Sequence, residues 1–361
     1  PTNSVEFLPD ITRPEGKDYV VHRMVSCVNG ADDTSSYVQV STVRLPNRIR
    51  TYSSTEFNPE IREYGGYVQD TPSKPVKVTV KILSNGEIHR ARYLPQNPNI
   101  IATKGAHNSV YIFDYSRHPS EPSGEFVCEM ELVGHKKGGF PLSWNPSESG
   151  RLLSGSDDGL ICMWDVDSNG PSSPTSVFEL EGLDVNDVCW SQFDSRVFVT
   201  GDSSGHLCFW DTKKGKSPIH RVKCTDHGQV LNLAPSFFSP YGLASGTCSG
   251  DIDLWDLRFL ANSAHHIDAH SGLEIRQIAW SPHDERFLAS GACDGRVCIW
   301  DLSKVGSSST DASAGPPELT FLHVGHYSPI NDLCWNHNEA NTICSVEENS
   351  YVQIWQPACL F

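Results

Sequence analysis

The sequence lacks several signatures that would point to chemistry or to a membrane. No apolar run approaches the ~18 residues that a membrane-spanning helix needs. There is no phosphate-binding loop of the G-x-x-x-x-G-K type, and no G-x-S-x-G nucleophile elbow accompanies any of the Ser-His-Asp sets described below. The 12 cysteines form no C-x-x-C pair, and no Cys/His cluster has zinc spacing. We therefore expect neither a membrane protein nor a metal or cofactor site.

Positive charge is also scarce. The 361 residues carry 28 Lys and Arg against 44 Asp and Glu, a formal net charge of −16. An acidic surface of this size repels nucleic acid and anionic lipid, and it attracts basic partners over long distances. Direct nucleic-acid binding is therefore not expected, whereas binding of a basic macromolecule is.

The cysteines recur at matched positions along the chain. Cys162, Cys208 and Cys298 each lie two residues before a tryptophan, and Cys189 and Cys334 each lie just before one. This placement is typical of small buried residues on strands. Buried unpaired thiols favour a reducing compartment, the cytosol or the nucleus.

An internal repeat dominates the sequence. One element is an aromatic residue that ends an alternating strand; we assign it to Phe7, Tyr93, Trp144, Trp190, Phe238, Trp280 and Trp335. A second is an aromatic residue that closes each unit before Asp or Gln: Phe113, Trp164, Trp210, Trp255, Trp300 and Trp355. Turns such as Asp158-Gly159 and Asp294-Gly295 separate the strands, because glycine adopts the positive φ of a tight turn.

Each unit predicts four short strands, which is one blade of a propeller. A single blade cannot bury both of its faces, so seven blades must stack in a ring. We predict an all-β, seven-bladed WD-repeat β-propeller that forms a single domain over residues 1–361. Two segments, 46–75 and 306–317, exceed the repeat, and the second has the Ser/Gly/Pro content of a flexible loop.

The ends of the chain predict how the ring closes. Residues 5–8 are expected to be the innermost strand of blade one, followed by strands at 19–27, 37–45 and 76–83. Blade seven is expected to contain strands at 330–335, 343–345 and 351–355. Its outer strand would come from residues upstream of Pro1.

Two repeats carry the residue types of a Ser-His-Asp hydrolase. They are His135, Ser154 and Asp158 in blade three, and His270, Ser290 and Asp294 in blade six. Blade five carries His227, Ser245 and Trp255, with Ser249 at the acid position. Because the set recurs with a tryptophan in each repeat, we interpret it as a buried network that fixes strand register, and we predict that the chain is not an enzyme.

Five segments outside the repeat pattern are more specific: RPEGKDY, RARYLPQNP, FDYSRHPS, GHKKGGFPLSWNP and GPPELTFLHVGH. Over nearly the whole chain they resemble the retinoblastoma-associated histone-binding WD-repeat proteins, the family of the small subunit of chromatin assembly factor one. The resemblance implies a nuclear histone chaperone subunit that serves chromatin assembly, acetyltransferase, deacetylase, remodelling and Polycomb complexes. The propeller itself is expected to be monomeric.

The family has two peptide sites. The histone-three tail binds the acidic end of the channel, and the resemblance assigns this site to Glu87, His89, Arg90, Phe140, Asn186, Glu274 and Glu348. Of these, Glu87, Arg90, Glu274 and Glu348 match the family's charged positions. Gly138, Asn186 and Arg276 depart from the family pattern, which removes two acidic groups and adds a cation.

The first helix of histone four binds a side groove in the family. The resemblance assigns its floor to Pro316, Pro317, Leu319, Phe321 and Leu322. The family's N-terminal helix, which forms one wall, would lie upstream of Pro1. The blade-six loop, which forms the other wall, has Asp311 as its only carboxylate, so weak histone-four binding is expected.

A second interpretation remains open. A WD-repeat adaptor for another partner, such as a substrate receptor of a ubiquitin ligase, would also keep the core while changing the surface.

Overall fold

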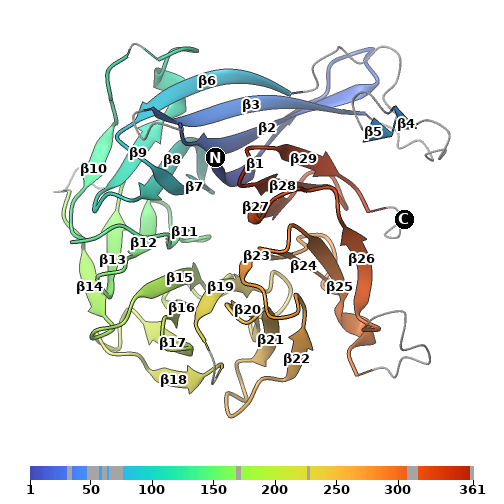
Figure 1. Cartoon of the computed structure of the whole chain (residues 1–361). Coiled ribbons are helices and arrows are strands. Elements are labelled where there is room, and N and C mark those ends of the chain that lie inside the picture. The colour runs from blue at the N-terminus through green and yellow to red at the C-terminus, as the bar shows by residue number, and fades with distance from the viewer. Residues whose placement is uncertain are drawn as a thin grey trace.

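The computed structural model describes residues 1–30, 35–46, 57–58, 63–64, 76–122, 124–167, 172–225, 228–306 and 316–357. It confirms the predicted fold: seven antiparallel sheets stand around a central axis as the blades of a β-propeller (Figure 1). Within this part of the chain, the helical content is limited to two 3-10 turns, η2 (Tyr115–Arg117) and η3 (Leu302–Lys304).

The first three blades are built from consecutive segments. Blade one contains β1 (Thr2–Thr12), β2 (Tyr19–Val28), β3 (Ser36–Pro46) and β6 (Val76–Ser84). Blade two contains β7 (Ile88–Leu94), β8 (Asn97–Gly105), β9 (Val110–Asp114) and β10 (Met130–Leu132). Blade three contains β11 (Leu142–Trp144), β12 (Arg151–Gly155), β13 (Leu160–Asp165) and β14 (Ser176–Glu179).

The remaining blades follow the same order. Blade four contains β15 (Val185–Trp190), β16 (Val197–Asp202), β17 (His206–Asp211) and β18 (His220–Lys223). Blade five contains β19 (Val230–Pro235), β20 (Gly242–Thr247), β21 (Asp251–Asp256) and β22 (His265–Asp268). Blade six contains β23 (Ile275–Trp280), β24 (Phe287–Ala292), β25 (Val297–Asp301) and β26 (Leu319–His323).

Blade seven differs from the others. It contains β27 (Ile330–Trp335), β28 (Ile343–Glu347) and β29 (Val352–Trp355), and no fourth strand pairs with β29 within the described residues. The predicted strand positions in blades one and seven are therefore confirmed, although β1 is longer than residues 5–8. Most of the inserted segment 46–75 and of the loop 306–317 lies outside the described residues, apart from the short pair β4 (Phe57–Asn58) and β5 (Glu63–Tyr64).

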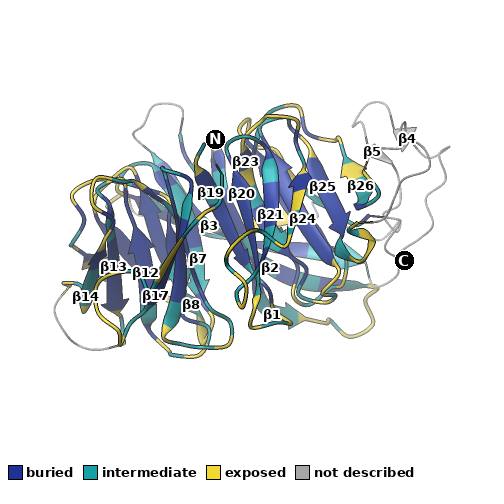
Figure 2. Cartoon of the chain, turned by 90° about the horizontal axis from the view of Figure 1, so that it is seen from below, coloured by how far each residue is buried: buried dark blue, intermediate teal, exposed yellow. Residues whose placement is uncertain are grey.

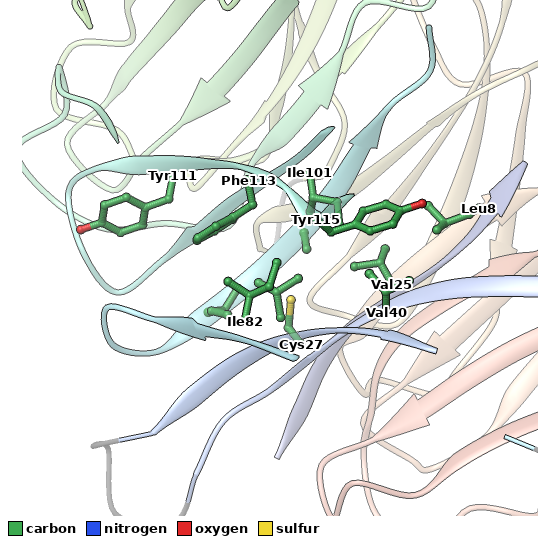
Figure 3. Close-up of a cluster of buried hydrophobic side chains, with 12 residues drawn as sticks. Leu8, Val25, Cys27, Val40, Ile82, Ile101, Tyr111, Phe113 and Tyr115 are labelled. Carbon is green, nitrogen blue, oxygen red and sulfur yellow. The ribbon is translucent and has the colours of Figure 1, made fainter. Parts of the chain in front are cut away.

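Seven apolar clusters hold the ring together, one at each joint between adjacent blades. In the joint of blades one and two, Val25 and Ile82 face Ile101 and Phe113 (Figure 3). The last joint packs Phe7 of β1 against Val346 of β28 and closes the circle. Buried strands thus fill the body of the ring, and exposed residues concentrate in its loops (Figure 2). Burial of apolar surface, which contributes about 25 cal/mol of free energy per Å², drives this stacking, because both faces of an isolated sheet would remain exposed to water.

The cysteines belong to this core. Cys162, Cys208, Cys298 and Cys189 are buried, as predicted, and Cys334 is partly buried. All the cysteines within the described residues are free thiols.

One assignment in the repeat was wrong. The position that ends the innermost strand is occupied in blade five by Pro235, which pairs with Leu243 as Trp190 pairs with Phe198 in blade four. Phe238 instead lies in the following loop and is exposed. The sequence pattern was misleading because Phe238-Ser239-Pro240 imitates the aromatic-x-Pro signature three residues too late.

Candidate functional site

The His–Ser–acid sets form hydrogen-bonded networks inside the blades. In blade six, His270 Nε2 lies 2.8 Å from Ser290 Oγ, and its Nδ1 lies 2.9 Å from Asp294 Oδ2. The indole of Trp300 donates to the same Ser290 Oγ at 2.8 Å. Blade three repeats this arrangement with His135, Ser154, Asp158 and Trp164.

Blade seven contains a further set that the sequence did not reveal. His326 bonds Ser345 through Nε2 at 2.6 Å and Glu347 through Nδ1 at 3.0 Å, and Trp355 donates to Ser345. The repeat pattern did not reveal this set because its acid is Glu347, the last residue of β28, whereas the acid in blades three and six belongs to an Asp-Gly turn. Burial lowers the pKa of His326, so its neutral ring can donate from Nδ1 and accept at Nε2.

In blade five the expected histidine, His227, lies outside the described residues. Among the described residues, Cys224 Sγ lies 3.2 Å from Ser245 Oγ. Trp255 still donates to Ser245 at 2.9 Å. Ser249 Oγ donates to Asp251 Oδ2 at 2.6 Å and lies 2.9 Å from Thr247 Oγ1.

These networks are suited to packing rather than to nucleophilic attack. Ser154, Ser290 and Ser345 are completely buried, and each Oγ is already engaged by an indole and an imidazole. A substrate atom therefore cannot approach these oxygens in the folded protein.

Replacing Ser290 with Ala is expected to destabilise the protein by about 1–3 kcal/mol, because the Trp300 and His270 groups lose their buried partner. Urea unfolding would measure this loss. Ser120→Ala, in the exposed connection between η2 and β10, is the matched control and is expected to change stability far less. A Ser290→Ala protein as stable as the parent would show that the network does not hold the blade.

The acidic candidates share one end of the channel. Glu87 and Glu274 immediately precede the innermost strands β7 and β23, and Glu348 lies in the turn between β28 and β29. In an antiparallel blade the start of the first strand and the turn between the second and third strands lie at the same end. We call this end, with Glu87, Asp157, Asp184, Glu274 and Glu348, the acidic end.

Arg90 does not lie on that surface. Its guanidinium crosses the channel from β7 to Asp187 Oδ1 of β15 at 2.7 Å and to Gln277 Oε1 of β23 at 3.4 Å. Asp187 also accepts from the backbone N–H of Leu233 at 2.9 Å. Three non-adjacent blades are therefore tied together, and Arg90 offers little charge to a ligand.

His89 and Phe140 form a stacked pair between blades two and three. Their ring centroids lie 4.3 Å apart at an interplanar angle of 15°, and Phe140 remains 47% exposed. The presence of glycine at the nearby position 138 has a structural explanation, because a Cβ there would lie 2.5 Å from the Ala106 carbonyl oxygen. Glycine at position 138 thus allows close packing of this loop on blade two.

Arg276 partly neutralises the acidic end. Its Nε lies 3.1 Å from Cys293 Sγ and 3.4 Å from Glu274 Oε2. Burial alone would lower the pKa of Arg276, but the hydrogen bond to Cys293 and the charges of Glu274 and Glu348 raise it. Asn186 is also engaged, donating to the Val230 carbonyl at 2.9 Å.

Two carboxylates at this end were missed in the sequence. Burial and the nearby charge of Asp184 raise the pKa of Asp157, and the charge of Lys137 lowers it in part. These charges act on Asp157 because Asp184 and Lys137 lie close to it. Asp157 is exposed, and its position directly before the Asp158-Gly159 turn was the available signal. Together Asp157 and Asp184 add two carboxylates to the acidic end.

The candidate groove residues do not form one exposed surface. Leu319 packs against the core between blades five and six, and Phe321 packs between blades six and seven, stacked on Trp355. Pro316 and Leu322 are exposed, and Pro317 is half-buried. Asp311 lies outside the described residues.

The described part of the chain contains no helix long and apolar enough to cross a membrane. The same residues contain no group of three or more His, Cys, Asp or Glu side chains placed to hold a metal ion.

The family model for the WD domain, G-beta repeat, matches residues 126–165, 173–211 and 261–301. Each match begins at or near the outer strand of one blade and ends with the third strand of the next, the usual offset between repeat and blade. The fold and these matches define a propeller scaffold suited to protein–protein interaction. WD repeats are therefore present in this chain over the three matched segments.

Proposed function

We propose that this chain is a histone-binding scaffold subunit of chromatin assembly, remodelling and histone-modifying complexes, and that it acts in the nucleus. The resemblance of its non-repeat segments to the histone-binding WD-repeat proteins motivates the proposal. The observation that supports it most directly is the set of five carboxylates at one end of the channel, beside the exposed ring of Phe140. A lysine or arginine side chain can pair with the carboxylates and lie on the ring.

Binding of a basic tail there would depend on several weak contacts. An exposed ion pair is worth about 0–1 kcal/mol, so affinity arises from the sum and falls as salt screens it. Arg276 forms an ion pair with Glu274 at the acidic end, and Arg90 forms an ion pair with Asp187 inside the channel. The surface therefore favours a tail that brings more than one cation.

The proposed histone-four contact is the weaker of the two. Leu319 and Phe321 are partly buried and pack against the clusters of the propeller, and Leu322 and Pro316 are the exposed apolar residues of the groove. Helix-in-groove binding draws on buried apolar area, so little affinity is expected from these residues alone.

Reversing Glu274 and Glu348 to Lys is expected to weaken binding of a histone-three tail peptide by well over tenfold and to slow association. Fluorescence anisotropy in 50 and 200 mM salt would measure both the affinity and its salt dependence.

The control is the double variant Glu285→Lys, Glu339→Lys, which makes the same change in net charge in loops at the opposite end. If both double variants bind as the parent does, the proposal is wrong; if both weaken binding equally, only net charge matters and the site is misplaced.

A further inference from the structure

A second surface lies at the end of the ring opposite the acidic end, between blades four and five. It results from an unusual residue, Pro235, at the position that ends the innermost strand β19 of blade five. Trp144, Trp190, Trp280 and Trp335 occupy this position in four other blades, whereas blade five has Pro235.

The tryptophan indole can bridge two blades. Trp335 donates across the joint to the Ala279 carbonyl of blade six at 3.0 Å, and Trp144 donates to the Arg92 carbonyl of blade two at 2.9 Å. Pro235 has neither the N–H nor the length to reach blade four. Its place in the β19–β20 ladder loses no hydrogen bond, because the neighbouring Ser236 N–H donates to Gly242.

An apolar depression lies at this joint. Its lining includes Cys189, Trp190, Val199, Pro235, Leu243 and Leu257. The Trp190 indole itself packs on the other side of blade four, in the apolar cluster of blades three and four, so the apolar side chains at this joint are chiefly Cys189, Val199 and Leu243. Trp144, Trp280 and Trp335 place an indole at the corresponding position of their joints, whereas this joint has the smaller ring of Pro235 and a shallow depression beside it.

Exposed aromatic side chains surround the depression. Phe193 lines it directly, and Phe238, Tyr241 and Phe259 follow around blade five, with exposures of 51%, 42%, 46% and 72%. The Arg258 guanidinium lies over the rings of Tyr241 and Phe259, at 4.9 and 5.9 Å from their centroids. Large aromatic groups that remain in contact with water at one place are typical of an interaction surface.

The charge around this patch contrasts with that of the whole chain. Lys213, Lys214 and Lys216 are exposed in the connection between β17 and β18, which leaves the ring at the same end. Lys213 is close enough to Asp194 to lower the pKa of that carboxyl, although the largest cause is the hydrogen bond from Arg196. A basic rim on a chain of net charge −16 is complementary to an acidic ligand.

We propose that this surface docks an acidic segment of a partner protein, which inserts one large apolar side chain into the depression beside Pro235. The inserted group takes the place of the indole that blade five lacks, and the flanking carboxylates pair with the lysine rim. This site goes beyond the proposed histone function, because it is at the other end of the ring and selects ligands of opposite charge.

The test uses a synthetic fifteen-residue peptide of Asp, Glu and Ser with one central Trp, and a matched peptide with Ala at that position. Anisotropy measurements on the full chain are expected to give a dissociation constant well below roughly 1 mM for the Trp peptide, and binding at least tenfold weaker for the Ala peptide. Equal affinity for the two peptides, or no binding below that concentration, overturns the proposal.

The deciding variant is Pro235→Trp, which restores the residue found in the other blades and fills the depression from within. It is expected to weaken Trp-peptide binding at least tenfold while leaving the circular dichroism spectrum unchanged. Should it fail to fold, the exposed double variant Phe193→Ser, Phe238→Ser carries the same expectation. Unchanged binding in a folded variant contradicts the proposal.

Two controls separate this site from other occupants. Glu274→Lys, Glu348→Lys changes the acidic end and is expected to leave affinity for the acidic peptide unchanged within twofold, whatever becomes of histone binding. A concentration-dependent dimer that Pro235→Trp abolishes would identify a second copy of this chain as the occupant and overturn the proposal, as would preferential binding of an oligonucleotide to the lysine rim.

Discussion

Acidification from pH 6.5 to pH 4 is expected to remove several kcal/mol of stability from this propeller. Burial, and then the neighbouring positive charge of Arg13, lower the pKa of His22 from 6.5 to about 4. Burial also lowers the pKa of His323 to about 4, and it lowers those of His135 and His326. These histidines are neutral in the fold, so the unfolded chain binds protons more readily below pH 6.5, and stability falls with pH.

His22 alone accounts for about 3 kcal/mol, since each unit of pKa shift corresponds to about 1.4 kcal/mol. Glu6 acts in the opposite sense: burial raises its pKa to about 7, so its protonation on acidification stabilises the fold. The histidines outnumber it. Because domains have about 5–15 kcal/mol in total, a loss of this size removes a large fraction of the stability but leaves a folded protein whose stability can be measured at pH 4.

Urea unfolding at pH 7, 5.5 and 4 tests this expectation with His22→Gln. The glutamine amide oxygen can accept from Asn336 Nδ2 as His22 Nδ1 does, but it cannot take up a proton in this range. The loss of stability between pH 6.5 and 4 should shrink by about 3 kcal/mol. His220→Gln, on the exposed strand β18, is the control; identical pH profiles for both variants and the parent would contradict the assignment to His22.

Replacing Asp332 with Ala is expected to destabilise the protein by about 3–5 kcal/mol. This buried carboxylate of β27 accepts from Arg92 of β7 at 3.2 Å, from Ser4 Oγ at 3.0 Å and from the Val5 N–H at 2.9 Å. It therefore joins blades seven, one and two, where the ring closes. In the Asp332→Ala variant the Arg92 guanidinium remains largely buried but no longer has its nearest counter-ion.

The matched comparison is Asp284→Ala, which removes an ion pair with Arg286 at the surface. That change is expected to cost no more than about 1 kcal/mol. Calorimetric melting would separate the two. If Asp332→Ala and Asp284→Ala lower the melting temperature equally, the closure does not depend on the buried carboxylate.

The repeat pattern was sufficient to predict the fold because it is set by local chemistry. The blades are specified locally by alternating strands, Asp-Gly turns and tryptophans such as Trp164 and Trp300. Seven such blades bury both faces of every sheet only when they stack in a closed ring. The error at Phe238 has the same origin: a local signature was matched without the strand pairing that identifies Pro235 as its true equivalent.

The site was less predictable because it depends on contacts between distant segments. Nothing local to Arg90 indicates that its guanidinium crosses the channel to Asp187, and the sequence interval between them is 97 residues. Asp157 and Asp184 likewise gather at the acidic end through the stacking of blades three and four. Side-chain direction, rather than residue type, decided which charges face a ligand.

The guanidinium of Arg90 also has a consequence for assembly. It occupies the axis of the ring, so no chain segment can thread from one end to the other without displacing a partly buried ion pair. Communication between the ends would require the packed strands to change their arrangement, and close-packed cores resist this. Ligands at the two ends should therefore bind with additive free energies. Saturation of one end would leave the affinity of the other unaltered, which lets a single copy hold a basic tail and an acidic partner at the same time.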